Sequence, residues 1–297
     1  MDYNGILLIN KPADITSFKV CEIVRKKFKI KKVGHGGTLD PFATGLLILG
    51  IGKGTKLMQI ISQHNKEYSG KMILGEKKDT FDFTGKTILK ADDEKLKKLK
   101  EDDILAIRNK FTGVIKQKPP QFSALKKNGK PLYEYARKGE FVELEYRTVF
   151  VEKFEITQIN IPEVEFKIKC SKGTYIRSIA NDLGEALGTF AYLKTLRRDS
   201  INGYYLDNAH ELDGISKSDI IPFDNALNIR KTRIKREFSP LLENGNILQL
   251  NHIIFENNIL EDGELVYVFG DKCSVVGVYS SEKKEIKPEI VYKKSLH

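Results

Sequence analysis

The strongest constraint on the fold of this chain is a continuous apolar run from Leu46 to Ile51, enclosed by Gly45 and Gly52. The run is short enough to be a strand of the protein core. The segment from residue 164 to residue 170 has a different pattern, because apolar and charged side chains alternate along it. That alternation is typical of a strand with one buried and one solvated face.

Further elements follow from spacing and from capping residues. Thr16-Ser17 is expected to cap a helix whose apolar residues reach Phe28, and Thr174 is expected to cap a second helix that is closed by Gly188. The remaining predicted elements are strands at 5–9 and 68–74, turn chemistry at 79–85, a charged helical excursion at 96–111 and a short helix at 131–138. Strands and helices without strict alternation predict an α+β catalytic domain around a largely antiparallel mixed sheet.

The character of the chain changes near Lys235. From there, short β-rich runs are separated by turn sequences such as Asn244-Gly245-Asn246 and Glu261-Asp262-Gly263. A length of 297 residues is enough for two domains. We therefore expect a catalytic domain at 1–234 and a small β-rich module at 235–297.

The charge balance predicts a polyanionic partner. The chain holds 50 Lys+Arg against 40 Asp+Glu, a net charge of +10, which favours nucleic acid. Part of the excess is a lysine run just before a glycine-rich stretch, made of Lys26, Lys27, Lys29, Lys31 and Lys32. Taken alone, such a run also fits an ordinary solvated surface.

Cysteine usage and the N-terminus predict a cytoplasmic protein without a membrane segment. Cys21, Cys170 and Cys273 are odd in number and far apart, so neither a disulfide framework nor a zinc site is expected. The first residues show neither the basic region nor the long apolar region of a signal peptide. No apolar span is long enough to cross a membrane.

Chemistry concentrates in the glycine-rich stretch from Gly34 to Gly45, which contains Asp40. Its glycines allow close approach of the backbone to a ligand, and Pro41 favours extended geometry at Asp40. An Asp-Pro pair also fits a plain turn in a surface loop. Apolar neighbours and the following core strand favour a partly desolvated carboxylate, which needs a cationic partner.

Arg177 is the candidate partner, because a cation in the first turn of a helix is disfavoured by the helix dipole and needs compensation. A carboxylate or a phosphate would supply it, although an ordinary solvated arginine also fits. Tyr68 could stack on a nucleobase and offer its hydroxyl for proton transfer, or could simply fill the core. His35 has no metal-ligand spacing to another histidine, and no nucleotide-cofactor or hydrolase signature is present.

The stretch from Gly34 to Gly45 resembles the signature loop of the TruB-type tRNA pseudouridine synthases, usually written GHTGTLDPxATG. Gly36 departs from this pattern, since the family usually has threonine there. Further matches occur in family order and span residues 5 to about 200; they are Ser123-Ala124-Leu125-Lys126, the segment 130–137, the segment 171–177, Asp182-Leu183-Gly184 and Leu196-Arg197-Arg198.

The resemblance implies the pseudouridine synthase fold, a PUA-like C-terminal module and a set of residue roles. Asp40 is the implied nucleophile, Arg177 its partner and Tyr68 the residue that stacks on the flipped base and could accept a proton. The other implied roles are substrate binding by His35, Tyr175 and Leu196, and support of the catalytic loop by Lys11 and Gly37. The implied substrate is the T-loop uridine of the TΨC arm of tRNA.

Conversion of uridine to pseudouridine moves one glycosidic bond within the nucleotide, so no cofactor and no metal are expected. The base must first leave its stack, at a cost of a few kcal/mol. A non-catalytic RNA-binding protein would share the basic charge but has no need of a carboxylate placed against a polyanion. A guide-RNA-dependent synthase would share the aspartate loop. Agreement with the stand-alone pattern favours action on tRNA without a guide RNA or an obligate protein partner.

Overall fold

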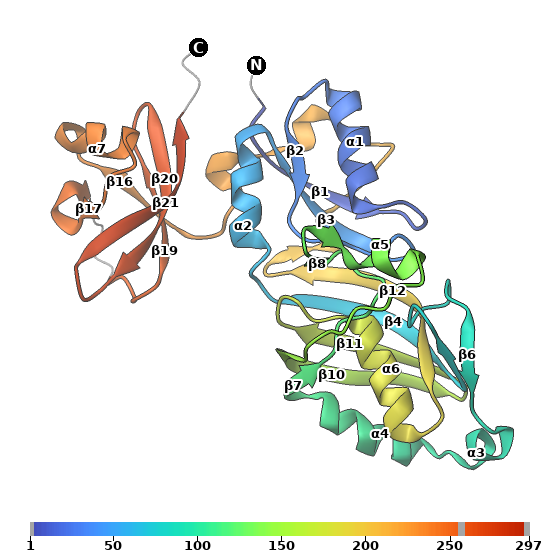
Figure 1. The fold of residues 1–297 in the computed structure, drawn as a ribbon. Coiled ribbons are helices and arrows are strands. Elements are labelled where there is room, and N and C mark those ends of the chain that lie inside the picture. The colour runs from blue at the N-terminus through green and yellow to red at the C-terminus, as the bar shows by residue number, and fades with distance from the viewer. Residues whose placement is uncertain (1–2, 255–258, 294–297) are drawn as a thin grey trace.

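The computed structural model describes residues 3–254 and 259–293. In this part of the chain the main element is an 11-stranded mixed sheet, with β14-β1-β3-β12-β4-β11-β10-β7 as its principal order (Figure 1). Its longer strands are β1 (Gly5–Lys11), β3 (Thr44–Ile51), β4 (Lys66–Leu74), β7 (Gly113–Gln117), β10 (Arg147–Asn160), β11 (Glu163–Cys170) and β12 (Ala191–Ile201). The shorter strands are β2 (Val33–His35), β13 (Tyr204–Tyr205), β14 (His210–Glu211) and β15 (Ile221–Pro222).

The long strands pair antiparallel, except where β12 meets β3. That parallel contact is limited to two residue pairs, Arg197 with Thr44 and Arg198 with Gly45. The sheet is thereby divided into a first half, β1 and β3, and a second half, β12, β4, β11, β10 and β7. The expected α+β fold around a largely antiparallel mixed sheet is confirmed.

The two halves of the sheet differ in what covers them, and the sequence patterns reflect this. Residues of β3 from Gly45 to Ile51 are all buried, because the first half has packed cores on both faces. In β11, buried Val164, Phe166 and Ile168 alternate with more exposed residues. One face of the second half is covered by helices and the other is open. Burial on both faces explains the apolar run of β3, and burial on one face explains the alternating pattern of β11.

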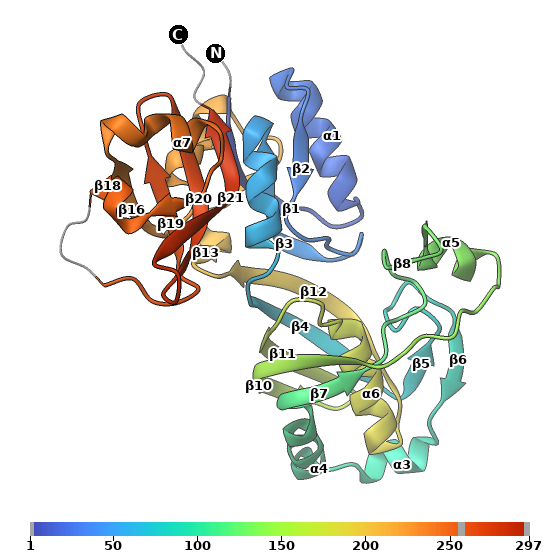
Figure 2. The same ribbon diagram turned by 60° about the vertical axis from the view of Figure 1, so that its left-hand side comes forward.

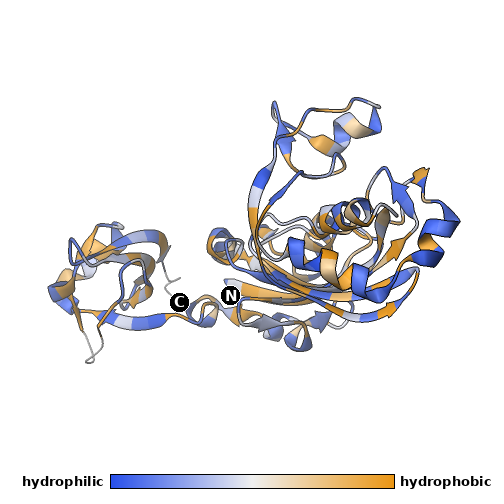
Figure 3. Ribbon diagram, turned by 90° about the horizontal axis from the view of Figure 1, so that it is seen from below, coloured by the Kyte–Doolittle hydropathy of each residue, from blue (hydrophilic) through white to orange (hydrophobic). Residues whose placement is uncertain are grey.

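Helices lie on one face of both halves. α1 (Ser17–Phe28) packs on the first half, and α6 (Ile176–Leu187) and α4 (Glu101–Arg108) pack on the second. The first half is covered on its other face by α2 (Met58–Ile61) and by the C-terminal module. Peripheral elements are α3 (Asp93–Lys98), α5 (Leu132–Arg137) and two small hairpins, β5 (Glu76–Lys78) with β6 (Thr87–Lys90) and β8 (Lys126–Lys127) with β9 (Lys130–Pro131). The segment that carries α5 projects from the body of the domain (Figures 2 and 3).

The C-terminal module is a six-stranded sheet with its own core, in the order β17-β21-β20-β19-β16-β18. Its elements are β16 (Arg230–Ile234), α7 (Ser239–Glu243), β17 (Leu248–Gln249), β18 (Ile253–Ile254), β19 (Leu265–Phe269), β20 (Cys273–Ser280) and β21 (Glu285–Lys293). The expected β-rich module is confirmed. The division at residue 235 stays a prediction, and the second sheet starts with β16 at Arg230.

The prediction that Thr174 caps the second helix is wrong. α6 begins at Ile176, and Tyr175 is its N-cap without a side-chain capping bond. The Thr174 hydroxyl donates instead to the Ser171 carbonyl at 2.9 Å. The side-chain amide of Gln117, on β7, accepts from the Tyr175 N–H at 2.8 Å and donates to the Tyr175 carbonyl at 3.0 Å. A side chain from another strand therefore replaces the local cap.

Candidate active site

A pocket of about 960 Å³ opens where the two halves of the sheet meet. Its walls come from the segment after β2, from β4, from the start of α6 and from residues 122–125. Seven of the eight residues singled out in the sequence line it, namely His35, Gly37, Asp40, Tyr68, Tyr175, Arg177 and Leu196. The structure thus brings together residues that are up to about half of the chain apart.

Asp40 and Arg177 form a bidentate ion pair at the wall of this pocket. The Arg177 Nε donates to Asp40 Oδ2 at 2.8 Å, and its Nη2 donates to Oδ1 at 3.0 Å. The Arg177 side chain is only 4% exposed, whereas the Asp40 side chain is 30% exposed. Arg177 therefore orients the carboxylate from the protein side and leaves part of it open to the pocket.

The other donors of Arg177 are bound as well. Its Nη1 donates to the Thr80 carbonyl at 2.8 Å and lies 3.3 Å from Asp82 Oδ2, while Nη2 also donates to the Phe122 carbonyl at 2.8 Å. The Asp82 carboxylate, 5% exposed, accepts in addition from the Thr84 N–H at 3.0 Å. Arg177 is the second residue of α6, so two carboxylates and two carbonyls provide the compensation expected for a cation in a first helical turn.

The loop that carries Asp40 is held by two buried cations. The Lys11 ammonium, fully buried, donates to the Pro41 carbonyl at 2.9 Å and to the Ile15 carbonyl at 2.7 Å. Burial lowers the pKa of Lys11 to about 8, although the nearby Asp14 and Asp40 carboxylates oppose this shift. Lys11 thus holds the loop from within the protein and is not among the residues that line the pocket.

The second cation is Arg198 on β12, which is 1% exposed. Its Nε donates to the Leu46 carbonyl at 2.7 Å, and its Nη2 donates to the Gly37 carbonyl at 3.2 Å. Both ends of the Asp40 loop are therefore attached to one side chain. Gly45 allows this close approach, because it has a φ of +98° and a Cβ there would lie 2.4 Å from the Arg198 carbonyl oxygen.

Tyr68 and His35 line the same pocket with polar groups in low-dielectric surroundings. Burial raises the pKa of the Tyr68 phenol, and the charge of Arg198 opposes the shift. Burial lowers the pKa of His35, and Arg198 acts in the same direction. Within the described residues, His35 Nδ1 is buried without a hydrogen-bond partner. Near neutral pH these side chains accordingly present an uncharged phenol and an uncharged imidazole.

Sequence reasoning missed Asp82, Arg198 and Lys66. Asp82 lies in the segment 79–85, which its composition marked as a turn, and Arg198 was only part of a motif. Lys66 lines the pocket and donates to the Ser62 and His64 carbonyls at 3.0 and 2.8 Å. No spacing rule links these residues to Asp40, since each reaches the site through the fold of a different strand or loop.

Among the residues that the structure describes, no group of three or more His, Cys, Asp or Glu side chains is arranged to hold a metal ion. Within the same residues, none of the helices has the length and apolar character needed to cross a membrane.

Comparison with known proteins shows which family this chain belongs to. Residues 25–176 match the model of the N-terminal domain of TruB family pseudouridylate synthases. The chain belongs to the TruB family. This family membership agrees with the resemblance of the loop from Gly34 to Gly45, and it makes the chain a pseudouridine synthase, an isomerase.

Curated relatives of this TruB-family chain carry the name tRNA pseudouridine synthase B. The protein of Clostridium tetani is 42% identical over 82% of this chain and 84% of its own length. That of Acholeplasma laidlawii is 43% identical over 82% and 86%, respectively. The relative from Burkholderia pseudomallei is 35% identical over 96% of both chains. The similarity therefore extends through most of the catalytic domain and, in the last case, into the C-terminal module.

Solved structures share the fold of this TruB-family chain. An H/ACA ribonucleoprotein bound to a substrate RNA containing 2′-deoxyuridine matches with a TM-score of 0.71 and 23% identity, over 98% of this chain and 85% of the other. A Cbf5-Nop10-Gar1 complex matches with a TM-score of 0.70 and 25% identity, over 99% and 84%. The pseudouridine synthase fold is thereby confirmed.

Proposed function

We propose that this chain isomerises the T-loop uridine of tRNA to pseudouridine, with Asp40 as the nucleophile. The observation that carries the proposal is the bidentate Asp40–Arg177 pair at the wall of a pocket of about 960 Å³. A carboxylate that is oriented by a buried arginine and partly exposed to the pocket is suited to attack a nucleotide that enters it. The relatives named tRNA pseudouridine synthase B support tRNA as the substrate.

The target uridine has to leave the base stack to reach Asp40, which costs a few kcal/mol. Tyr68 supplies an aromatic face in the pocket, and base–aromatic stacking is worth about 1 to 3 kcal/mol per base. The raised pKa of its phenol suits stacking and hydrogen-bond donation in the bound state. Acceptance of the C5 proton by Tyr68 would require prior ionisation, which the charge of Arg198 favours.

His35, Tyr175 and Leu196 complete the proposed nucleotide site, and Lys11 and Gly37 support the loop. Gly37 contributes its carbonyl to the bond with Arg198. The chemistry conserves all atoms, since the bond between N1 and the ribose is replaced by a bond between C5 and the same carbon, while C5 loses a proton and N1 gains one. The proposed mechanism therefore uses only residues of this chain.

Replacement of Asp40 tests the proposal. We expect Asp40→Asn to bind an unmodified tRNA transcript within about tenfold of the wild-type affinity but to form no pseudouridine, because the charge is needed for attack and not for docking. Product is mapped by primer extension after carbodiimide treatment. Asp199→Asn, on the open face of the sheet, is the matched control and should retain activity. Normal product from Asp40→Asn would remove this residue from the mechanism.

A guide-RNA-dependent activity is the second candidate, favoured by the shared fold with H/ACA structures. Identity to the curated tRNA pseudouridine synthase B relatives is higher, at 42% for the Clostridium tetani protein, which supports stand-alone action. The discriminating assay contains only the purified protein and a tRNA transcript. Product that appears only after addition of a guide RNA or a further protein would favour the second candidate.

A further inference from the structure

Five lysines at the end of α1 form a charged surface outside the pocket. This surface, the α1 lysine cluster, consists of Lys26, Lys27, Lys29, Lys31 and Lys32, all of which are exposed. Lys27 donates to the Asp213 carbonyl. Among residues 3–254 and 259–293, the ion pair of this helix is Lys19–Glu22 and no ion pair involves the cluster. The positive charge of the cluster is therefore not neutralised by carboxylates of the described chain.

Two elements connect the cluster to the pocket, α1 before it in the chain and β2 after it. Thr16, Ser17 and Phe18, at the start of α1, line the pocket, and α1 is about 18 Å long at 1.5 Å per residue. From Lys32, strand β2 leads directly to His35, a distance of about 10 Å at 3.3 Å per residue. His35 also lines the pocket. The cluster thus lies within reach of the backbone that flanks a nucleotide in the pocket.

The backbone at Lys29 supplies a second, independent observation. Lys29 is the C-cap of α1 and adopts a left-handed conformation, with φ +55° and ψ +42°. Glycine takes this conformation without the steric cost that a Cβ brings, and α6 does end on a glycine in the same conformation, Gly188 with φ +67°. The helix dipole does not require Lys29, since Arg25, Lys26 and Lys27 already occupy the last turn of α1.

We propose that the α1 lysine cluster is an RNA-contacting surface that binds backbone phosphates beside the nucleotide in the pocket. A lysine kept at a strained backbone position is explained if its charge is used. The proposal rests on the proposed function, because the ligand is the RNA substrate. Lysine binds phosphate as a point charge without reading sequence, so the cluster contributes affinity and salt dependence and leaves the chemical step unchanged.

A pair of charge-matched variants tests the surface. In the first, all five lysines of the cluster are changed to glutamine. In the control, five exposed lysines of the α3–α4 region are changed to glutamine; they are Lys95, Lys97, Lys98, Lys100 and Lys110. Both variants lose the same charge, and α1 and α3 lie at opposite ends of the catalytic domain in two views (Figures 1 and 2).

Affinity for an unmodified tRNA transcript is measured by fluorescence anisotropy over a range of salt concentrations. We expect the cluster variant to bind about tenfold more weakly, with a log–log salt slope reduced by about 0.7 to 0.9 for each lost phosphate contact. The control should stay within about twofold of the wild type, with its slope unchanged. Equal weakening of the two variants would mean that only net charge matters, which overturns the proposal.

The single change Lys29→Gly separates stability from binding. We expect the melting temperature to rise by about 2 °C, because glycine relieves the left-handed position. The log–log salt slope should fall by the amount expected for the loss of about one phosphate contact. A higher melting temperature with an unchanged salt slope would show that Lys29 does not contact RNA.

Turnover distinguishes a failure of this proposal from a failure of the proposed function. At saturating tRNA, the cluster variant should form pseudouridine at the wild-type kcat with a raised KM. If the wild type forms none, the proposed function fails, and the comparison of the two charge-matched variants still decides whether the cluster binds RNA. A wild type that forms pseudouridine beside a cluster variant that binds normally would refute the surface alone.

Discussion

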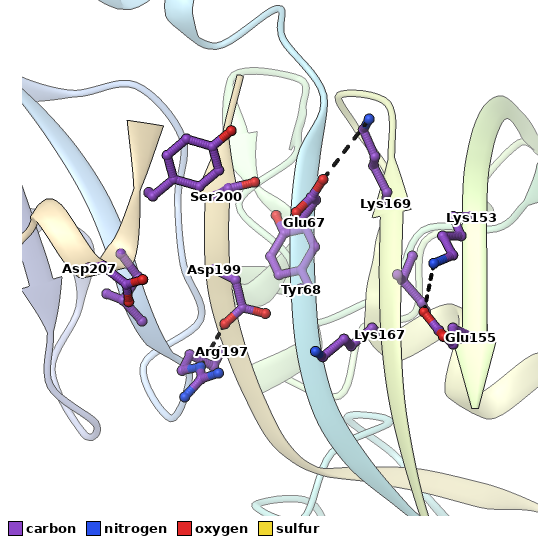
Figure 4. Close-up of a pocket in the computed structure, with 13 residues that line it drawn as sticks. Glu67, Tyr68, Lys153, Glu155, Lys167, Lys169, Arg197, Asp199, Ser200 and Asp207 are labelled. Carbon is purple, nitrogen blue, oxygen red and sulfur yellow. Dashed lines mark hydrogen bonds and ion pairs between the residues drawn. The ribbon is translucent and has the colours of Figure 1, made fainter. Parts of the chain in front are cut away.

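The two faces of the second half of the sheet carry the same kinds of charged residue in opposite environments. On the helix-covered face, Arg177 and Asp82 are about 4% and 5% exposed and make fixed, multiple hydrogen bonds. On the open face, a pocket of about 400 Å³ is lined by charged residues of β4, β10, β11 and β12 (Figure 4). There Lys153 pairs with Glu155 at 2.8 Å although the two side chains are 68% and 47% exposed.

The difference shows that burial, and not the number of ion pairs, decides whether an ion pair fixes the geometry of its side chains. An exposed pair is screened by water and holds neither partner firmly, whereas a buried pair fixes its geometry and is costly to break. The pKa values follow the same division. Burial lowers the pKa of Lys66 to about 8, while the hydrogen bonds that Lys71 donates to Glu163 and Glu165 raise the pKa of Lys71 on the open face.

The largest expected effect comes from breaking the buried network. Arg177→Met should lower the free energy of unfolding by about 3 to 5 kcal/mol, because the change leaves Asp82 buried without its cation. The matched change on the open face, Arg197→Met, should cost at most about 1 kcal/mol. Urea unfolding of both variants measures the contrast. Similar losses in the two variants would contradict the distinction between the faces.

A milder change in the same network should affect catalysis more than folding. Asp82→Asn keeps the shape but removes the charge beside Arg177, so we expect Asp40 to lose its fixed orientation and kcat to fall by about 10- to 100-fold. KM for tRNA should change little, since Asp82 lines the pocket with a side chain that is only 5% exposed and is engaged by Arg177. Single-turnover kinetics measures both values, with Glu155→Gln as the control. A raised KM at unchanged kcat would assign Asp82 to substrate binding instead.

The smallest effect is a dependence of stability on pH. The pKa values of Lys11 and Lys66 are lowered from 10.5 to about 8 in the folded protein. Between these values the unfolded chain binds more protons, so the free energy of unfolding should rise with pH. We expect a rise on the order of 1 kcal/mol per lysine between pH 8 and 10.

Urea unfolding at a series of pH values measures the rise, and Lys66→Met should remove its share. Removal of the open-face pair by Lys153→Met and Glu155→Leu should leave the midpoint and its pH dependence unchanged, since both side chains are solvated. A flat profile for the wild type would show that the two buried lysines keep their ordinary pKa values in the folded protein.

Much of the fold could be predicted from local pattern. The apolar run from Leu46 to Ile51 and the alternation from 164 to 170 correctly predicted β3 and β11. The reason is that the spacing of apolar residues along a strand reflects how many of its faces are buried. The long strand β10 was not recognised, since in its Arg147–Asn160 span exposed positions outnumber buried ones. Its place beside β11 and β7 depends on pairing with strands elsewhere in the chain.

The site divides in the same way. By itself the sequence determined that Asp40 stands in a glycine-rich loop before a core strand, and that a cation at Arg177 needs a partner. Only the tertiary structure decided that these two residues pair, that Asp82 and Arg198 join them, and that Gln117 holds the start of α6 in place of Thr174. The physical reason is that helix caps and loop glycines act within a few residues, whereas buried ion pairs depend on distant segments meeting in space.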